Sequence, residues 1–220
     1  MRNAAWLSGL RTAALKNYPR AKSASDCTEG DKNLKVSTLR NMILCALFAA
    51  LIAVGAFIKI PVPVVPFTLQ YLFTMLSGLM LGSKWGLAAV GIYIALGLAG
   101  LPVFAQGGGI GYVLQPSFGY IIGFALGAFV TGLIAQKKRR PSLARLLAAS
   151  FAGLFLVYFI GMLYYYLISK FYLNTPIGLW PLFLYCFILA VPGDIILSVL
   201  GAVLAKRIDI RKINGSAGND

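Results

Sequence analysis

The chain has 220 residues, of which 59% are hydrophobic and only 12% are charged. A soluble domain carries about 25% charged residues, so this composition predicts an integral membrane protein. A membrane-spanning helix needs about 20 residues, which leaves room for roughly six such helices and excludes an additional soluble catalytic domain. The net charge of +14 does not indicate nucleic-acid binding, because the basic residues cluster between apolar runs.

Residues 1–36 are polar and basic, and we expect them to form a poorly ordered cytoplasmic tail. The near-helical spacing of Trp6, Leu7 and Leu10 leaves a short interfacial helix as the alternative. Residues 207–220 are expected to form a second cytoplasmic tail.

Six apolar segments lie between these tails and predict an all-α membrane domain over residues 37–206. The connection after the first segment, 61–66, is rich in proline, and the second segment is short for a span. The expected spans are 39–60, 67–82, 85–105, 117–136, 146–169 and 180–205.

The distribution of basic residues predicts the orientation of these spans. With the N-terminus in the cytoplasm, eighteen of the twenty Lys and Arg residues fall on the cytoplasmic side, and only Lys59 and Lys170 fall outside. Cytoplasmic loops of membrane proteins carry such an excess of basic residues. We therefore expect six transmembrane helices, both termini in the cytoplasm, and a bacterial cell membrane as the location.

The sequence lacks the residues that several common functions need. The sequence has no histidine, and Cys27, Cys45 and Cys186 do not have the spacing of metal ligands, so no metal site or disulfide framework is expected. Segment 78–84 combines glycines with a lysine, but not at the spacing of a phosphate-binding loop. The chain is therefore not expected to be an enzyme, to hydrolyse ATP itself or to hold a cofactor.

Asp194 is the one acidic residue between Asp31 and Asp209, and it lies within the last apolar segment after Pro192-Gly193. A carboxylate at membrane depth costs about 2.5–3.5 kcal/mol on insertion scales, so it needs a partner, a cavity or a ligand. We expect Asp194 to contact a ligand or ion, the alternative being a structural hydrogen bond between helices. Ser198, one turn further on, is a candidate neighbour.

Uncharged polar residues supply further candidates. The glycine-rich stretch 106–112 and the residues after it are interpreted as a cap over an outward-facing pocket, or else as a flexible connector. Two tyrosines of the fifth span, seven residues apart, share a helix face and either line a cavity or belong to an interfacial belt. The candidate contacts are Gln70, Gln106, Gly108, Tyr112, Gln115, Ser117, Tyr120, Tyr158 and Tyr165.

Small residues recur every four positions in two of the spans, which lets another helix approach closely. In the fourth span, Gly119, Gly123 and Gly127 predict internal helix packing, with a partner face as the alternative. In the first span, small-residue pairs built from Ala46, Ala49, Ala50 and Ala53 leave the same two alternatives open.

Five stretches, in order and on the predicted topology, resemble the BioY family, the biotin-binding S-components of energy-coupling-factor (ECF) transporters. They are Ala-Leu-Phe-Ala-Ala-Leu-Ile-Ala-Val-Gly-Ala-Phe-Ile-Lys-Ile-Pro (46–61), Val-Pro-Phe-Thr-Leu-Gln (65–70), Gly-Leu-Pro-Val-Phe-Ala-Gln-Gly-Gly-Gly (100–109), Pro-Ser-Phe-Gly-Tyr-Ile-Ile-Gly-Phe (116–124) and Val-Pro-Gly-Asp (191–194).

The resemblance implies a six-helix S-component that binds biotin near the outer surface, with Asp194 contacting the ureido ring. It also implies that a transmembrane coupling subunit and two ATPase subunits energise uptake. The family places small residues of the first helix against the coupling subunit, which favours Ala46, Ala50 and Ala53 as a partner face.

This sequence departs from the family at one position. Many members have a lysine three residues after the aspartate, where this chain has Leu197. The ligand carboxylate must therefore be held by another group, for which the candidates are Lys59, Lys170, Gln115 and the backbone N–H groups of 107–111.

Two alternatives to a biotin S-component stay open at this point. One is an S-component for another vitamin. The other is a stand-alone ion- or proton-coupled carrier with Asp194 as its coupling carboxylate. Such carriers usually show inverted repeats with broken helices in both halves, whereas only the sixth segment here has an obvious Pro-Gly break.

Overall fold

The computed structural model describes residues 24–60, 67–138, 141–173, 180, 184, 188 and 190–208. The chain divides into two compact units, Met1–Thr38 and Leu39–Asp220, and the boundary falls within the first described helix, α2 (Ala24–Phe57). All the candidate site residues lie in the second unit.

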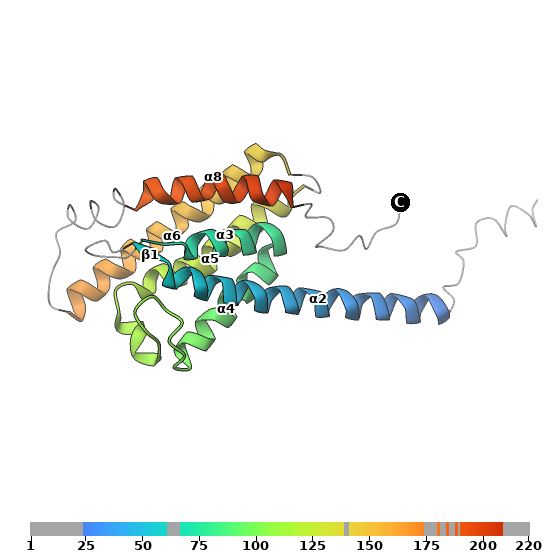
Figure 1. The fold of residues 1–220 in the computed structure, drawn as a ribbon, viewed down its shortest axis with the longest axis horizontal. Coiled ribbons are helices and arrows are strands. Elements are labelled where there is room, and N and C mark those ends of the chain that lie inside the picture. Colours follow the sequence, from blue (N-terminus) through green and yellow to red (C-terminus); the bar gives the residue numbers. More distant parts are fainter. Residues whose placement is uncertain are drawn as a thin grey trace, which may run out of the picture. The chain divides into compact units, whose positions relative to one another are not determined.

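The described part of the second unit consists of helices joined by loops, with one hairpin of two-residue strands (Figure 1). In that hairpin β1 and β2 are antiparallel, with Lys59 opposite Thr68 and Ile60 opposite Phe67. The Pro-rich turn 61–66 between them lies outside the described residues. The elements after α2 are β1 (Lys59–Ile60), β2 (Phe67–Thr68), α3 (Gln70–Leu81), α4 (Ser83–Leu98), the 3-10 helix η1 (Ile110–Leu114), α5 (Phe118–Gln136), α6 (Leu143–Phe171) and α8 (Val191–Arg207).

Three stretches of helix are long and apolar enough to cross a membrane: Val36–Phe57, Phe118–Gln136 and Leu143–Phe171. The helices α3 and α4 are apolar but have 12 and 16 residues. At 1.5 Å per residue they are about 18 and 24 Å long, against a hydrocarbon core of about 30 Å. The structure therefore supports a membrane protein, while the count of six spans stays a prediction.

The start of α2 and the end of α4 differ most from the predicted spans. Helix α2 begins at Ala24, inside the expected tail. Helix α4 ends at Leu98 rather than 105, because Gly100 has a φ of 106° and Pro102 cannot continue a helix. Of the sixth predicted span, the structure describes 180, 184, 188 and the stretch from 190 onward.

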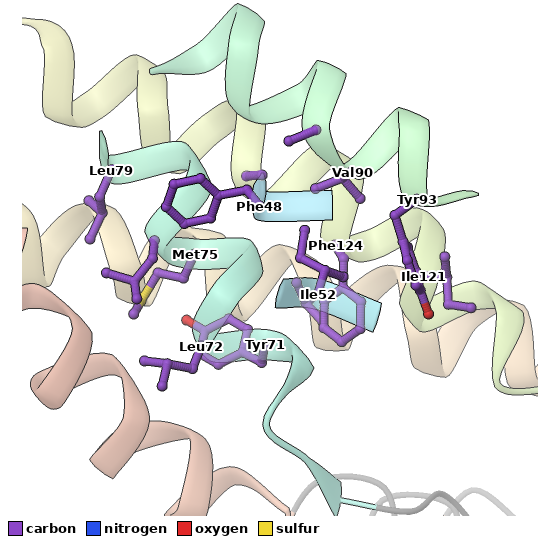
Figure 2. Packing of buried hydrophobic residues seen from close by; sticks show 14 of the residues in the cluster. Phe48, Ile52, Tyr71, Leu72, Met75, Leu79, Val90, Tyr93, Ile121 and Phe124 are labelled. Carbon is purple, nitrogen blue, oxygen red and sulfur yellow. The ribbon is translucent and has the colours of Figure 1, made fainter. Parts of the chain in front are cut away.

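Helix α3 lies at the centre of the apolar core. All its residues except Phe73 are buried, and it packs against α4, α5 and α8. Figure 2 shows side chains of α3 packed among residues of α2, α4 and α5. The labelled residues are Tyr71, Leu72, Met75 and Leu79 of α3 with Phe48, Ile52, Val90, Tyr93, Ile121 and Phe124.

Glycines permit the close approach of α5 to α6. A Cβ atom at Gly123 would lie 2.9 Å from the carbonyl oxygen of Val157, and one at Gly127 would lie 3.2 Å from that of Gly153. At Gly119 it would overlap the Tyr164 side chain, at 2.2 Å. The prediction that Gly119, Gly123 and Gly127 serve internal packing is confirmed.

The contact of α3 with α5 depends on Gly78, where a Cβ would lie 2.4 Å from the carbonyl oxygen of Ala128. We expect Gly78→Ala to destabilise the protein by about 1–3 kcal/mol, because backbone must move to admit the methyl group. Thermal unfolding in detergent measures the effect. Gly91→Ala is the matched control, since its Cβ would meet nothing within 4 Å; equal melting temperatures for both variants would contradict the packing argument.

Candidate functional site

Asp194 lies in the first turn of α8, whose N-cap is Ala190. Pro192 has no backbone N–H to leave unpaired at that position. The carboxylate is therefore close to the positive end of the α8 dipole, which favours a negative charge. Asp194 is only 7% exposed, so its two oxygens depend on protein or ligand partners.

The two carboxylate oxygens of Asp194 have different surroundings. The hydroxyl of Tyr158 in α6 donates a hydrogen bond to Oδ2 at 2.5 Å. The other oxygen, Oδ1, is buried and has no hydrogen-bond partner among the described residues. The Tyr158 ring meets that of Tyr120 edge to face, with centroids 6.0 Å apart. The structure thus brings together three of the predicted site residues.

A second set of hydroxyl contacts holds the turn that follows Asp194. Ser198 donates to the backbone carbonyl of Asp194 at 2.7 Å, as its helical spacing predicted. The hydroxyl of Tyr71 in α3 lies 3.1 Å from the Ser198 oxygen and 3.1 Å from the carbonyl oxygen of Ser150 in α6. These bonds connect α3, α6 and α8 around the aspartate.

Tyr71 and Ser150 were not among the site residues predicted from sequence. Tyr71 follows Gln70 in an apolar helix, and nothing in its spacing distinguishes it from a core aromatic residue. Its role depends on the packing of α3 against α6 and α8, which local sequence does not report.

The loop between α4 and α5 is anchored by Phe104, which is 1% exposed. Its ring centroid lies 5.4 Å from that of Tyr93 and 4.5 Å from that of Tyr112. Gly107 and Gly109 have φ angles of 122° and 100°, which favour glycine. Their N–H groups donate to the carbonyls of Phe104 and Gly97, so these two of the candidate ligand donors are used within the protein.

Lys59 connects the hairpin to this loop. Its ammonium donates to the carbonyl oxygen of Ala105 at 2.9 Å. An ammonium has three N–H groups, so Lys59 retains donors for a further acceptor. Lys170, the other lysine expected outside the membrane, lies over the rings of Tyr166 and Phe171 instead, 5.8 and 5.6 Å from their centroids.

The remaining loop candidates fall into a buried and an exposed set. Tyr112 is buried, its hydroxyl accepts a hydrogen bond from Ser117 at 3.3 Å, and burial raises its pKa above the usual value. Tyr112 therefore stays a neutral phenol at physiological pH. Gln106, Gly108 and Gln115 are exposed, so their side of the loop is accessible.

Two further predicted residues are buried on helices. Gln70 begins α3 and is 3% exposed, with its amide beside the Tyr93 hydroxyl. Tyr165 is 8% exposed on the same α6 helix as Tyr158.

The small residues of α2 divide between two faces. Ala46 and Ala50 are exposed and Ala53 is half-buried, whereas Ala49 is 4% exposed and belongs to the core. The first three therefore leave a surface of small side chains on α2.

Comparisons with known proteins agree with one another. The family model described as "BioY family" matches residues 28–213. The "Probable biotin transporter BioY" of Lysinibacillus sphaericus is 44% identical over 175 residues, which cover 80% of this chain and 89% of that protein. The "Biotin transporter BioY" of Thermotoga maritima is 50% identical over 125 residues, covering 56% of this chain and 73% of that protein.

A solved structure has the same fold. It is the crystal structure of "the S-component for biotin from an ECF-type ABC transporter", with a TM-score of 0.67 and 30% identity. The match covers 78% of this chain and 91% of that one. Sequence and fold thus agree over most of the length, and the chain belongs to the BioY family.

Proposed function

We propose that this protein captures biotin at the membrane as the substrate-binding subunit of an ECF-type ABC transporter. The observation that carries the proposal is the buried carboxylate of Asp194 in a member of the BioY family. One of its oxygens accepts a hydrogen bond from Tyr158, and the other has no partner among the described residues.

The chemistry of the site fits the ureido ring of biotin. A ureido N–H is a neutral donor, and a carboxylate accepts it in a charge-assisted hydrogen bond. Because Tyr158 already occupies Oδ2, the oxygen left for the ring is Oδ1. A ligand without the N–H would leave that buried oxygen unsatisfied, which makes the site selective.

The proposal extends to topology and partners. Six spans within residues 37–206 would leave cytoplasmic tails at both ends, and a coupling subunit and two ATPase subunits would energise uptake. The exposed small residues Ala46 and Ala50 would contact the coupling subunit, with Ala53 at the margin. The residues Gln106, Gly108, Tyr112, Gln115 and Ser117 between α4 and α5, together with Tyr120 of α5 and Tyr165 of α6, would surround the ligand.

Asp194→Asn should lower biotin affinity about 10- to 100-fold, because the amide replaces a charged acceptor. Tyr158→Phe should lower it about tenfold, because Oδ2 loses its donor. Equilibrium binding of biotin to purified protein measures both effects. Tyr166→Phe, on the same helix beside Lys170, is the matched control and should bind as the wild type does. Unchanged affinity in Asp194→Asn would refute the assignment.

Lys59→Met should lower biotin affinity about fivefold or less, since an exposed ion pair is weak. Its affinity for biotin methyl ester should not change, because the ester carries no charge for Lys59 to hold. Lys84→Met removes another exposed cation and serves as the control. If the ester loses affinity as biotin does, Lys59 acts through the Ala105 carbonyl rather than through the ligand carboxylate.

Ala50→Leu should reduce co-purification with a co-expressed coupling subunit and reduce biotin uptake, because a larger side chain separates closely packed helices. Biotin binding to the isolated protein should be unchanged. Ala95→Leu, which also enlarges an exposed alanine but on α4, is the control. Full ATP-independent uptake by the protein alone would instead favour a stand-alone carrier.

A further inference from the structure

Gln70 carries a second buried polar atom without a partner. The residue is 3% exposed, and Nε2 forms no hydrogen bond within the described part of the chain. The hydroxyl of Tyr93, beside this amide, itself donates to the carbonyl oxygen of Val103 at 3.2 Å. An amide nitrogen has two N–H groups, so Gln70 retains a donor for another acceptor.

The backbone at Gln70 is held in place. Its carbonyl accepts a hydrogen bond from Thr74 at 2.8 Å. A Cβ atom at Gly55 of α2 would lie 3.1 Å from the Gln70 nitrogen and Cα, so α2 packs directly against this turn. The amide is thus presented from a fixed position at the start of α3.

Gln70 is the first residue of α3 and Asp194 lies in the first turn of α8, and side-chain hydrogen bonds join the two helices near that end. The residue next to Gln70, Tyr71, reaches Ser198, which bonds to the Asp194 carbonyl. One buried group offers an N–H and the other an acceptor oxygen, and the two do not bond to each other. A ligand that presents an acceptor beside a donor would satisfy both.

We infer that Gln70 donates a hydrogen bond to the ureido carbonyl oxygen of the ligand whose N–H is accepted by Asp194. A cyclic urea carries its carbonyl between two N–H groups, so its acceptor and donors lie on neighbouring atoms. This inference rests on the proposed function and makes Gln70 a specificity-determining residue. Asp194 recognises the N–H donor of the ring, and Gln70 recognises the carbonyl acceptor of the ring.

The assignment is tested by measuring the affinities of wild-type protein and Gln70→Met for biotin and for 2-thiobiotin. In 2-thiobiotin the ureido oxygen is replaced by sulfur, which is a weak acceptor. Wild-type protein should prefer biotin over 2-thiobiotin, and Gln70→Met should reduce this preference about tenfold. Biotin affinity itself should fall about 10- to 100-fold in the variant. Gln136→Met is the control, because its amide oxygen accepts from Ser83 at the far end of α5 and should not affect the preference.

The outcomes separate this inference from the proposed function. Equal loss of both ligands in Gln70→Met would mean that the amide only supports the fold. If Gln70→Met lost affinity for biotin but not for biotin methyl ester, the Gln70 amide would hold the ligand carboxylate. Either result overturns the inference. Gln70→Asn keeps an amide on a shorter side chain and should also reduce the preference, so a misfolded methionine variant leaves the test intact. Failure of the wild type to bind biotin would overturn the proposed function instead.

Discussion

The hydrogen bond from Tyr158 to Asp194 joins α6 to the first turn of α8 in a bundle that has little water to satisfy polar groups. In that setting a buried carboxylate needs partners for its lone pairs, and the phenol supplies one of them. Ser198 and Tyr71 then hold the next turn of α8 against α3. The position of the aspartate therefore depends on three helices rather than on α8 alone.

The same helices can approach closely because glycine replaces larger residues at their contacts. Gly123 and Gly127 of α5 lie against the backbone of α6, and Gly78 of α3 lies against that of α5. Apolar contact gives helices little driving force for association within lipid, so close packing and interhelical hydrogen bonds must supply it. The stripe of small residues and the tyrosine–aspartate bond thus have one structural consequence: they hold α3, α6 and α8 in register at the candidate site.

Long apolar segments were predictable from sequence, and tertiary contacts were not. The predicted span 117–136 matches α5 (Phe118–Gln136), because glycine-rich apolar sequence runs without interruption to a basic end. Asp194 was recognisable because it is the one acid in its apolar segment, and Tyr158 because it shares a face with Tyr165. Tyr71 was not recognisable, since its partners lie on α6 and α8, far from it in sequence.

Because residue 197 is a leucine, no cation follows Asp194 one turn further along α8. Where the resemblance to the family leads us to expect a lysine one turn away, this chain has Leu197, and the described partner of the Asp194 carboxylate is the neutral Tyr158 hydroxyl. A neutral N–H on the ligand would gain a charge-assisted bond to the ionised carboxylate. An unpaired buried donor or acceptor costs about 1–3 kcal/mol, which the ligand recovers only if its own groups match. Polar matching at Asp194 and Gln70, rather than apolar burial, would then determine which ligands this protein accepts.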